Sequence, residues 1–307
     1  MINKIVIILG PTGTGKSDLA LFLAEKIGGS IIIADSRKVY KYMDIGTNKQ
    51  SFRERQRAKH YLIDIVTPAE RFNVKLYQLH AKKAIQEIYS QNKNVLIVGG
   101  TGLYIKVLTK GIFSLPDIPP EIRRSLNEGA KRIDSATLYN RLVDVDPTTA
   151  EKLHPNDKLR ILRALEVYVA TDVPLSSYHE KHNFTEESYE CLKIGLDISR
   201  ERLYKNLENR ALKMLKSGWL EEVKSLLKMG FKRSDPGFYA LGYKHIIAYL
   251  DGEIEKEEME RLIKRDTKRY AKRQFTWFQT DPEIIWYKYP YPYDKILNKV
   301  KRFLLQN

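Results

Sequence analysis

The chain of 307 residues has a single cysteine, Cys191, and only six histidines. One cysteine excludes an intramolecular disulfide framework and fits a reducing cytoplasm, where we expect the protein to act. The histidines show no ligand spacing with the cysteine or with one another, so no structural zinc is expected. The sequence also lacks an apolar run of about 18 residues, the length that spans a bilayer. Its N-terminal apolar run is short and leads into a glycine-rich loop, so neither a membrane span nor a signal peptide is predicted.

Acidic residues are outnumbered in this chain. There are 38 Asp and Glu against 53 Lys and Arg, which gives a formal net charge of +15. Simple metabolic kinases rarely need such an excess, whereas a protein that docks on a polyanion does. A generally lysine-rich proteome is the alternative explanation. The hydrophobic content of 43% is ample for one large or two moderate domains with a real core.

The first motif is a phosphate cradle near the N-terminus. Residues 5–9 form a continuous apolar run of strand length, typical of a parallel strand buried on both faces. The next eight residues satisfy G-x-x-x-x-G-K-[ST] and form the predicted diphosphate or polyphosphate site: Gly10, Pro11, Thr12, Gly13, Thr14, Gly15, Lys16 and Ser17. Glycines let backbone N–H groups wrap an anion, and the following helix adds its positive end. Lys16 would reach the terminal phosphate oxygens, and the Ser17 hydroxyl would ligate Mg²⁺. A glycine-rich turn without a ligand is the alternative.

Further apolar runs predict five more strands, at residues 30–34, 61–66, 94–98, 192–196 and 283–287. The first four of the six strands alternate with helical patterns such as residues 74–89. This alternation predicts a P-loop-containing α/β fold with a doubly wound, mainly parallel sheet. The stretch at 200–279 is helical again, and a short basic helix at 294–305 closes the chain.

The strand pattern disappears between Pro116 and Glu190. Helix-like segments replace it, among them residues 156–169, and His154-Pro155-Asn156-Asp157 makes a good helix start. We therefore predict an α/β core of residues 1–115 and 191–307, interrupted by an all-helical insertion domain at 116–190.

The acid that a nucleotide hydrolase needs is missing from its usual place. Such enzymes carry a second apolar strand that ends in a Mg²⁺-binding carboxylate, but here the strand at 94–98 runs into Gly99-Gly100-Thr101-Gly102. A small hydroxyl residue flanked by glycines would let a ligand come close. Asp35 instead follows the strand at 30–34, and the carboxyl ends of strands in such sheets line the ligand crevice. Its carboxylate could hold Mg²⁺, accept a proton, or cap a helix.

Several strings together closely resemble the tRNA dimethylallyltransferases. They run in order along the chain: Gly10–Ser17, Asp35-Ser36-Arg37-Lys38-Val39-Tyr40, Asp44-Ile45-Gly46-Thr47, His60-Tyr61-Leu62-Ile63-Asp64, Val98–Tyr104, His154–Asp157, Arg160–Glu166, Leu241-Gly242-Tyr243-Lys244 and Ala271–Trp277. Tyr61 departs from the family pattern, which has a second histidine there. The C-terminal zinc-finger extension typical of eukaryotic members is also lacking, so the chain resembles the short bacterial form.

The resemblance implies a function for the P-loop. It would hold the diphosphate of dimethylallyl diphosphate, with Mg²⁺ on Ser17, while the isoprenyl group moves to N6 of adenosine 37 of a tRNA. The exocyclic amine of adenine must lose a proton as it attacks, so a general base is needed. Asp35 is the candidate base, and Thr101 is expected to hydrogen-bond the same base edge or the substrate oxygen. The target base must leave its stack to enter the crevice.

The tRNA contacts are implied by the same resemblance. The residues concerned are Asp35, Ser36, Arg37, Lys38, Thr101, Arg123, Leu159, Arg160, Ile161, Leu162, Arg163, Gly242, Tyr243 and Lys244. The spacing of Arg160 and Arg163 places both on one helix face, while Leu162 and Leu165 turn the other way.

A second RNA-binding surface is predicted from charge alone. Lys264, Lys268 and Lys272, and likewise Arg265, Arg269 and Arg273, repeat every four residues. Like charges at this spacing destabilise a helix by about 0.2–0.5 kcal/mol per pair. A phosphate backbone would reverse that cost, which points to phosphate contacts at Lys268 and Arg269. A plain solvated helix face is the alternative.

Three rival functions are open at the level of sequence. A small-molecule kinase would share the P-loop but turn over ATP and ignore RNA. An RNA-binding protein with a nucleotide switch would not depend on Asp35. An adenylate isopentenyltransferase, which prenylates free nucleotides, would not need the helix that carries Arg160 and Arg163. The hypothesis we favour is a monomeric enzyme whose partners are dimethylallyl diphosphate and a tRNA anticodon stem-loop. No membrane partner is expected.

Overall fold

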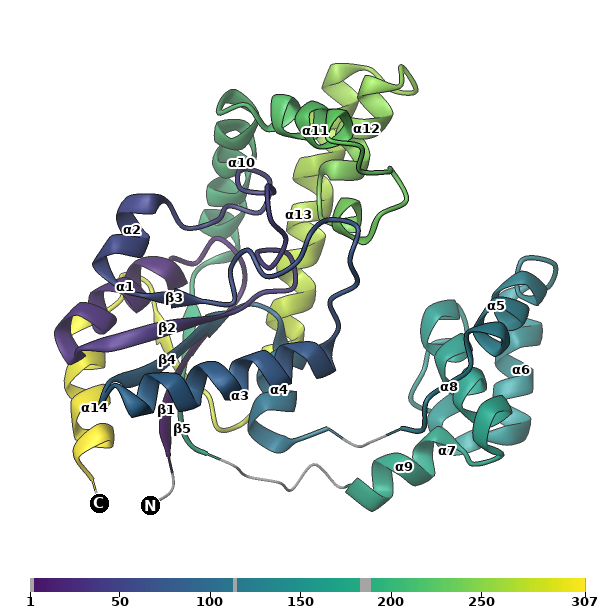
Figure 1. Cartoon of the computed structure of the whole chain (residues 1–307), viewed down its shortest axis with the longest axis horizontal. Helices are drawn as coiled ribbons and strands as arrows, with labels where there is room; N and C mark the ends of the chain where they lie inside the picture. Colours follow the sequence, from purple (N-terminus) through teal and green to yellow (C-terminus); the bar gives the residue numbers. More distant parts are fainter. Residues whose placement is uncertain (1–2, 113–114, 183–188, 307) are drawn as a thin grey trace. The chain divides into compact units, whose positions relative to one another are not determined.

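The computed structural model describes residues 3–112, 115–182 and 189–306. The chain forms two compact units (Figure 1): Met1–Thr109 together with Ser188–Asn307, and Lys110–Glu187. The sequence predicted the corresponding boundaries at 116 and 191.

The first unit is built on a six-stranded sheet in the order β3-β2-β4-β1-β5-β6, in which every paired strand is parallel. The strands are β1 (Lys4–Leu9), β2 (Gly29–Ala34), β3 (His60–Tyr61), β4 (Asn94–Gly99), β5 (Glu190–Asp197) and β6 (Ile285–Lys288). Non-consecutive neighbours such as β1 and β4 require crossover connections, which helices supply. The predicted P-loop-type α/β fold with a doubly wound sheet is confirmed.

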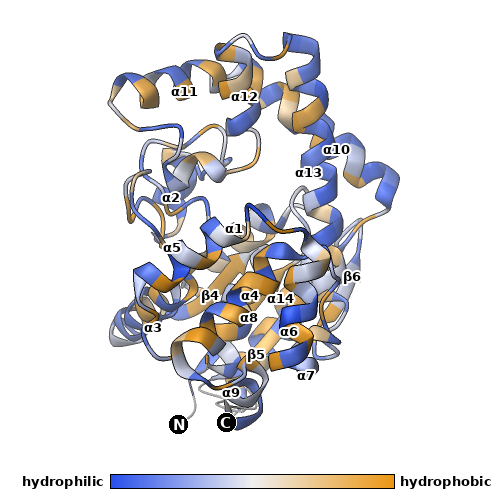
Figure 2. Ribbon diagram, turned by 90° about the vertical axis from the view of Figure 1, so that its right-hand side faces the viewer, coloured by the Kyte–Doolittle hydropathy of each residue, from blue (hydrophilic) through white to orange (hydrophobic). Residues whose placement is uncertain are grey.

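Helices cover both faces of this sheet. Alternate residues of β1 point to opposite faces. Val6 and Ile8 pack with α1 (Lys16–Ile27) and α14 (Tyr293–Leu305), whereas Ile5 and Ile7 pack with α3 (Val74–Ser90) and α4 (Gly102–Lys110). Burial on both faces explains why the strand is continuously apolar. Figure 2 shows this hydrophobic interior in orange at β4 and β5.

The predicted strand at residues 61–66 was wrong in length. β3 contains only two residues, and a single bridge joins Tyr40 and Val66 beyond it. Leu62 and Asp64 have φ angles of 63° and 58°, in the left-handed region that a strand cannot use. Apolar composition predicted the strand, but the backbone there turns so that Asp64 faces Lys49.

A group of helices stands beyond the carboxyl edge of the sheet. It comprises α10 (Arg200–Lys216), α11 (Trp219–Lys228), the 3₁₀ turn η1 (Pro236–Tyr239), α12 (Tyr243–Leu250) and α13 (Lys256–Phe278). The helix α2 (Phe52–Arg57) follows the loop after β2. Trp219, Phe238, Tyr243 and Ile263 form a separate apolar core here, together with Val39, Tyr40 and Met43 of the loop. This core places the loop and α13 over the ends of the strands.

All regular secondary structure in the described residues of the second unit, 110–112 and 115–182, is helical. Its helices after α4 are α5 (Pro120–Gly129), α6 (Ser135–Val145), α7 (Pro147–Ala150), α8 (Lys158–Thr171) and α9 (Leu175–His182). Leu138, Leu142, Ile161 and Leu165 lie in its core. The predicted helix start is confirmed, because the Asp157 side chain caps α8 by accepting a hydrogen bond from the Arg160 N–H. Across the described parts of both units, no helix has the length and apolarity to cross a bilayer.

Candidate active site

Three predicted site segments meet at one edge of the sheet. The P-loop follows β1, Asp35 follows β2, and Thr101 follows β4. β1 pairs with β4, and β4 pairs with β2, all parallel. The carboxyl ends of these neighbouring strands therefore bring the three segments together, as the sequence predicted for ligand-binding residues of an open α/β sheet.

The P-loop has the backbone conformation that an anion cradle needs. Gly13 and Gly15 have φ angles of 88° and 87°, which residues with a Cβ rarely adopt. A Cβ on Gly13 would also lie 2.8 Å from Leu207 of α10. Gly15 is the N-cap of α1 and no side chain caps this helix end. The first N–H groups of α1 are therefore available to a bound anion.

A cavity of about 620 Å³ lies over this loop. The six predicted residues from Thr12 to Ser17 line it, but Gly10 and Pro11 do not. The Pro11 carbonyl instead accepts hydrogen bonds from the Thr14 hydroxyl and from Lys16 Nζ, at 2.9 and 2.6 Å. Gly10 and Pro11 thus shape the loop from outside the cavity, and their predicted contact with diphosphate stays a prediction.

Four cations and three carboxylates line this cavity. The cations are Lys16, Lys38, Lys49 and Arg210, and the carboxylates are Asp18, Asp35 and Glu54. Burial, then repulsion from Arg210 and Lys38, lowers the pKa of Lys16 to about 7 despite the opposing effect of Asp35. Burial, aided by Arg210, likewise lowers the pKa of Lys38 to about 8 although Asp35 opposes it. Such crowding of positive charge is costly by itself and favours a multiply charged anion.

Binding of inorganic diphosphate should therefore take up protons near pH 8. The bound anion stabilises the charged form of Lys16 and raises its pKa above the value of about 7 in the free protein. The affinity for diphosphate is then greatest below pH 7. It falls as the pH rises from about 7 to the higher pKa that Lys16 has in the complex. Calorimetry in buffers of different ionisation enthalpy measures the uptake. Lys16→Arg, which stays charged, is the control for titration of the ligand itself. Equal proton uptake by the two proteins would contradict the assignment.

Lys38, which was predicted to contact tRNA, lies in the wall of the diphosphate cavity. Its Nζ donates to Gln50 Oε1 at 3.2 Å, and the Gln50 amide reaches Ser17 Oγ at 3.4 Å. Lys38 thus lies next to the P-loop, and its predicted contact with tRNA stays a prediction.

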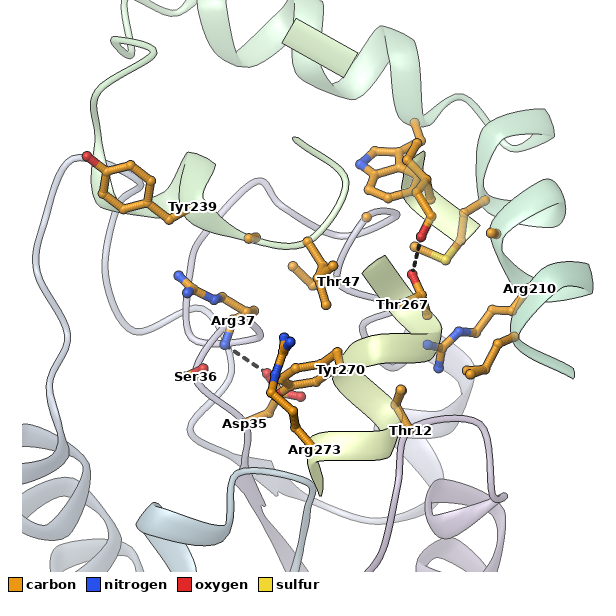
Figure 3. A pocket seen from close by; sticks show the side chains of 18 residues that line it. Thr12, Asp35, Ser36, Arg37, Thr47, Arg210, Tyr239, Thr267, Tyr270 and Arg273 are labelled. Carbon is orange, nitrogen blue, oxygen red and sulfur yellow. Dashed lines mark hydrogen bonds between the residues drawn. The ribbon is translucent and has the colours of Figure 1, made fainter. Parts of the chain in front are cut away.

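Asp35 lies where two cavities meet. A second cavity of about 270 Å³ shares Thr12, Asp35 and Arg210 with the first (Figure 3). Asp35 Oδ1 accepts hydrogen bonds from the Arg37 and Lys38 N–H groups, at 2.8 and 3.3 Å. The carboxylate therefore caps a turn rather than a helix. These bonds fix its orientation at the boundary between the cavities.

The second cavity is lined by residues from both helical and loop segments. It includes the predicted residues Ser36 and Arg37, with aromatic side chains Trp219, Tyr239 and Tyr270. Burial, followed by the neighbouring charge of Asp35, raises the pKa of Tyr270 to about 12, while a hydrogen bond with Thr101 opposes the shift. Tyr270 therefore stays neutral and keeps its hydroxyl proton next to Asp35 at physiological pH. A cavity lined by both aromatic and polar side chains suits an aromatic ring with hydrogen-bonding edges.

Thr101 is held by the residues around Asp35, and its glycine neighbours make room for side chains of α13. Thr101 Oγ1 accepts a hydrogen bond from the Ser36 N–H at 3.3 Å. A Cβ on Gly100 would lie 2.1 Å from Gln274, and one on Gly102 would lie 2.1 Å from Trp277. The two glycines therefore make room for side chains of α13. Gly100 also lines the diphosphate cavity, so the prediction that glycines beside Thr101 let a ligand come close stays a prediction.

Gln274 joins the P-loop to this segment. Its Oε1 accepts from the Thr12 N–H and its Nε2 donates to the Gly100 carbonyl, both at 2.8 Å. This buried amide is satisfied on both sides and fixes the distance between two walls of the site. The family-like string Ala271–Trp277 thus has a structural explanation.

The predicted tRNA contact of Tyr243 does not fit the structure. Its side chain is fully buried against Trp219, and its hydroxyl donates to Glu222 Oε1 at 2.6 Å. Gly242 also packs on Trp219, since a Cβ there would lie 2.1 Å from the indole. Lys244, in contrast, has a side chain that is 65% exposed, 3.7 Å from Asp266.

The predicted tRNA-binding string on α8 divides between two faces of the helix. Leu159 is exposed, and Arg160 and Arg163 have partly or largely exposed side chains. The side chains of Ile161 and Leu162 are buried in the core of the second unit, so they position the helix, and the predicted tRNA contact of this string stays a prediction. The helical period of 3.6 residues puts them on the opposite side from the arginines.

The exposed arginines already have acidic partners. Arg160 Nη1 lies 3.0 Å from Asp157, and Arg123 and Arg163 share the buried carboxylate of Glu166, at 3.3 and 3.0 Å. Glu166 thereby holds the two arginines at a fixed spacing on one surface of the second unit.

Lys268 and Arg269 lie in a basic groove between α10 and α13. The groove is lined by Arg200, Tyr204, Glu208, Arg261, Lys264, Arg265, Lys268, Arg269 and Lys272. Glu208 is the one acid among the lining residues, and it pairs with Lys268. Four of the other six cations have acidic partners outside the lining: Arg261 with Glu258, Lys264 with Glu260, and both Arg265 and Arg269 with Asp266. The surface is therefore positive, with seven cations against four acids. Arg273 breaks from the predicted series because it lines the second cavity.

Arg210 is the main site residue that sequence reasoning missed. It lies on the same face of α10 as the buried Leu203, Leu207 and Ala211. Burial lowers its pKa, and Asp35 opposes that shift. An arginine on an otherwise apolar helix stripe was the available signal, because such a charge needs an anionic partner.

Tyr61, which departs from the family pattern, lies away from both cavities. Its hydroxyl donates to Glu87 at 2.9 Å, and Lys59 Nζ sits 4.6 Å from the centre of its ring. These contacts tie the edge strand β3 to α3.

The chain matches a known protein family and several known proteins. A family model described as IPP transferase matches residues 38–281. The tRNA dimethylallyltransferase of Geobacter metallireducens is 48% identical over 301 residues, which is 98% of this chain and 97% of that protein. That of Carboxydothermus hydrogenoformans is 46% identical over 288 residues, or 94% of this chain and 92% of that protein.

Solved structures of transferases that act on tRNA are also similar to this chain. The tRNA isopentenylpyrophosphate transferase of Bacillus halodurans has a TM-score of 0.72 at 34% identity, covering 98% of this chain and 95% of that one. A eukaryotic dimethylallyltransferase acting on tRNA has a TM-score of 0.79 at 29% identity, covering 93% of this chain and 74% of that one.

Proposed function

This chain belongs to the IPP transferase family of tRNA dimethylallyltransferases, and we propose that it transfers a dimethylallyl group from dimethylallyl diphosphate to N6 of adenosine 37 in tRNA. One observation carries the proposal. The cavity over the P-loop and the second cavity meet at Asp35 and Arg210. A leaving diphosphate and an attacking base can thus approach one carbon atom from two sides.

The P-loop cavity is suited to the leaving group. As the allylic C–O bond breaks, negative charge grows on the diphosphate. The N–H groups at the start of α1, with Lys16, Lys38 and Arg210, surround the place where that charge develops. Preorganised donors of this kind stabilise a transition state because they need no reorientation during the reaction.

Asp35 is suited to accept the proton. N6 of adenine forms the new bond to carbon and loses one hydrogen, which passes to a carboxylate oxygen of Asp35. The turn bonds from Arg37 and Lys38 orient that carboxylate. Tyr270 lines both cavities, and its hydroxyl would supply a polar contact to the edge of the base. Thr101 lines neither cavity, but it hydrogen-bonds with Tyr270 and accepts from the Ser36 N–H, so it would hold these two residues in place.

The residues around Ser17 fit a magnesium ion. The Ser17 hydroxyl, Asp18 and Glu54 all line the diphosphate cavity, and burial together with the charge of Glu54 raises the pKa of Asp18. The described residues contain no cluster of three or more His, Cys, Asp or Glu that could hold a metal by itself. Phosphate oxygens and water would complete the shell, as Mg²⁺ prefers. When bound, Mg²⁺ would neutralise charge on the diphosphate, and Ser17 would be its protein ligand.

The basic groove between α10 and α13 supports an RNA substrate. Seven cations line it, and phosphates of an anticodon stem-loop match such a surface better than a free nucleotide does. Arg123, Arg160 and Arg163 offer further contacts on the second unit. We take the active form to be a monomer that acts in the cytoplasm, in keeping with the single cysteine.

The test compares acceptors directly. Labelled dimethylallyl diphosphate is incubated with an anticodon stem-loop or with AMP, and the nucleosides are analysed. Modification of adenosine 37 in the stem-loop alone is the expected result. Efficient prenylation of AMP would favour the adenylate isopentenyltransferase class, and turnover of ATP without RNA would favour a kinase.

Charge reversal in the basic groove should weaken stem-loop binding and flatten its salt dependence. Lys268→Glu with Arg269→Glu removes two phosphate contacts, so the slope of log K against log[salt] should fall by about two. The choice of adenosine should be unchanged, because phosphate contacts position the RNA and base contacts specify it. Binding titrations at several salt concentrations measure the slope.

Lys224→Glu with Lys228→Glu on α11 is the matched control for this experiment. It changes the net charge equally at two residues outside the groove. A slope that falls equally in both double variants would mean that only net charge matters, and that the groove is a solvated helix face.

A further inference from the structure

One loop forms a wall common to both cavities. Residues 43–50, here called the wall loop, contain no regular helix or strand. Gly46 and Thr47 line the diphosphate cavity and also the second cavity. Thr47 extends into the second cavity in Figure 3. The position of this loop therefore decides how the two substrates face each other.

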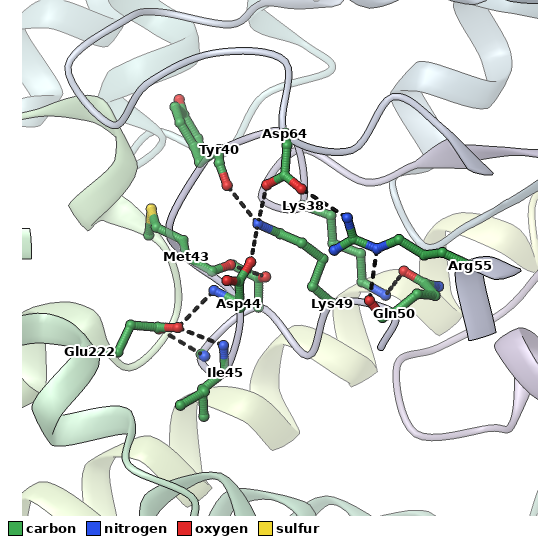
Figure 4. A network of polar contacts seen from close by, with 12 residues as sticks. Lys38, Tyr40, Met43, Asp44, Ile45, Lys49, Gln50, Arg55, Asp64 and Glu222 are labelled. Atoms are coloured by element: carbon green, nitrogen blue, oxygen red, sulfur yellow. Dashed lines mark hydrogen bonds and ion pairs between the residues drawn. The ribbon is translucent and has the colours of Figure 1, made fainter. Parts of the chain in front are cut away.

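The carboxylate of Glu222 on α11 holds the backbone of the wall loop. Its Oε2 accepts hydrogen bonds from the N–H groups of Asp44 and Ile45, at 2.7 and 2.6 Å, and its Oε1 accepts from Gly46 at 3.1 Å (Figure 4). The Tyr243 hydroxyl adds a fourth donor at 2.6 Å. Three successive N–H groups on one carboxylate form a strong, charge-assisted anchor.

The other end of the wall loop has an anchor of its own. Lys49 has a side chain only 1% exposed, and its Nζ contacts both Asp44 and Asp64 at 2.6 Å. It also donates to the Tyr40 carbonyl at 2.8 Å. Lys49 thus fixes the base of the loop, while Glu222 fixes the segment that carries Gly46.

Gly46 is pressed against the same helices. A Cβ at this position would lie 2.0 Å from Trp219 Nε1 and 2.5 Å from the Tyr243 hydroxyl. Trp219 itself lines the second cavity. Glu222, Trp219 and Tyr243 therefore form one support that determines where Gly46 and Thr47 stand.

We propose that Glu222 is a positioning residue for the transfer reaction, acting through the backbone of residues 44–46 to hold the wall between the two substrates. The inference rests on the proposed function. Glu222 lines neither cavity, so its effect passes through the loop. Displacement of a wall by about 1 Å can cost about 10²-fold in rate, because the reacting atoms lose their alignment.

Glu222→Ala should therefore lower kcat by about 30- to 100-fold at saturating substrates. The dissociation constant for inorganic diphosphate should change by less than about threefold, because the P-loop N–H groups and Lys16 are not held by Glu222. Timed turnover assays measure kcat, and calorimetry with inorganic diphosphate measures the dissociation constant. Glu221→Gln, at the exposed neighbouring residue, is the matched control and should behave as wild type.

Two further variants keep the inference testable if Glu222→Ala folds poorly. Gly46→Ala displaces the loop through a clash with Trp219 and Tyr243 while the Glu222 carboxylate is kept, and it should show the same loss of kcat. Glu222→Gln keeps one acceptor oxygen and should restore part of the rate. A fully folded Glu222→Ala protein with kcat within threefold of wild type would overturn the inference, as would parallel losses of kcat, diphosphate affinity and folded fraction. Failure of the wild type itself to modify a stem-loop would instead count against the proposed function.

Discussion

Asp35→Asn is expected to lower turnover by about 10²- to 10⁴-fold while both substrates still bind. Asparagine keeps the oxygen that accepts the Arg37 and Lys38 N–H groups, so the turn should survive. It removes the carboxylate that takes the proton from N6 of adenine. Single-turnover measurements with a stem-loop and dimethylallyl diphosphate separate this chemical step from binding and product release.

Asp197→Asn supplies the matched control for Asp35. Asp197 ends strand β5 of the same parallel sheet, but it lines neither of the two cavities. Its substitution should leave the rate within threefold of wild type. If Asp35→Asn retained more than about a tenth of the wild-type rate with chemistry limiting, another group would have to be the general base.

The second large effect is expected for Lys16→Ala. Loss of this ammonium group removes charge stabilisation from the departing diphosphate, at a cost of about 10²- to 10³-fold in kcat. The KM for dimethylallyl diphosphate should rise as well, because the same cation contacts the ground state. Affinity for the stem-loop should hardly change. Steady-state kinetics and RNA titrations give these three quantities.

Lys26→Ala is the control for this helix. Lys26 is exposed in the last turn of α1, at the opposite end from the P-loop. Its loss should affect neither constant. An equal loss of stem-loop affinity in Lys16→Ala would mean that Lys16 contacts RNA, and the division of the site into a diphosphate side and a base side would be wrong.

Much of the core was predictable because its signals are local. The run at residues 5–9 is apolar at every position, and the structure buries it on both faces of a parallel sheet. The P-loop motif requires glycines at fixed spacing, and these residues adopt the positive φ angles that the spacing indicates. The cap of α8 at Asp157 is likewise an interaction between near neighbours in sequence.

The sequence was least informative where local composition was used to infer the path of the backbone or the direction of a side chain. Residues 61–66 have the apolar content of a strand, but positive φ angles at Leu62 and Asp64 end it early. Ile161, Leu162 and Tyr243 belong to family-like strings with a tRNA-binding role, yet their side chains are buried. The glycines around Thr101 were expected to let a ligand come close, and the sequence did not show that they also make room for Gln274 and Trp277.

The sequence by itself determined the fold class, the phosphate cradle and the acid after the second strand, because each depends on residues close together in the chain. Only the tertiary structure decided that Arg210 faces Asp35, that Gln274 joins Thr12 to Gly100, and that Glu222 holds the N–H groups of residues 44–46. In each case the residues are separated by well over one hundred residues of chain. A side chain has no partner until packing brings distant backbone to it, so spacing along the sequence cannot reveal such contacts.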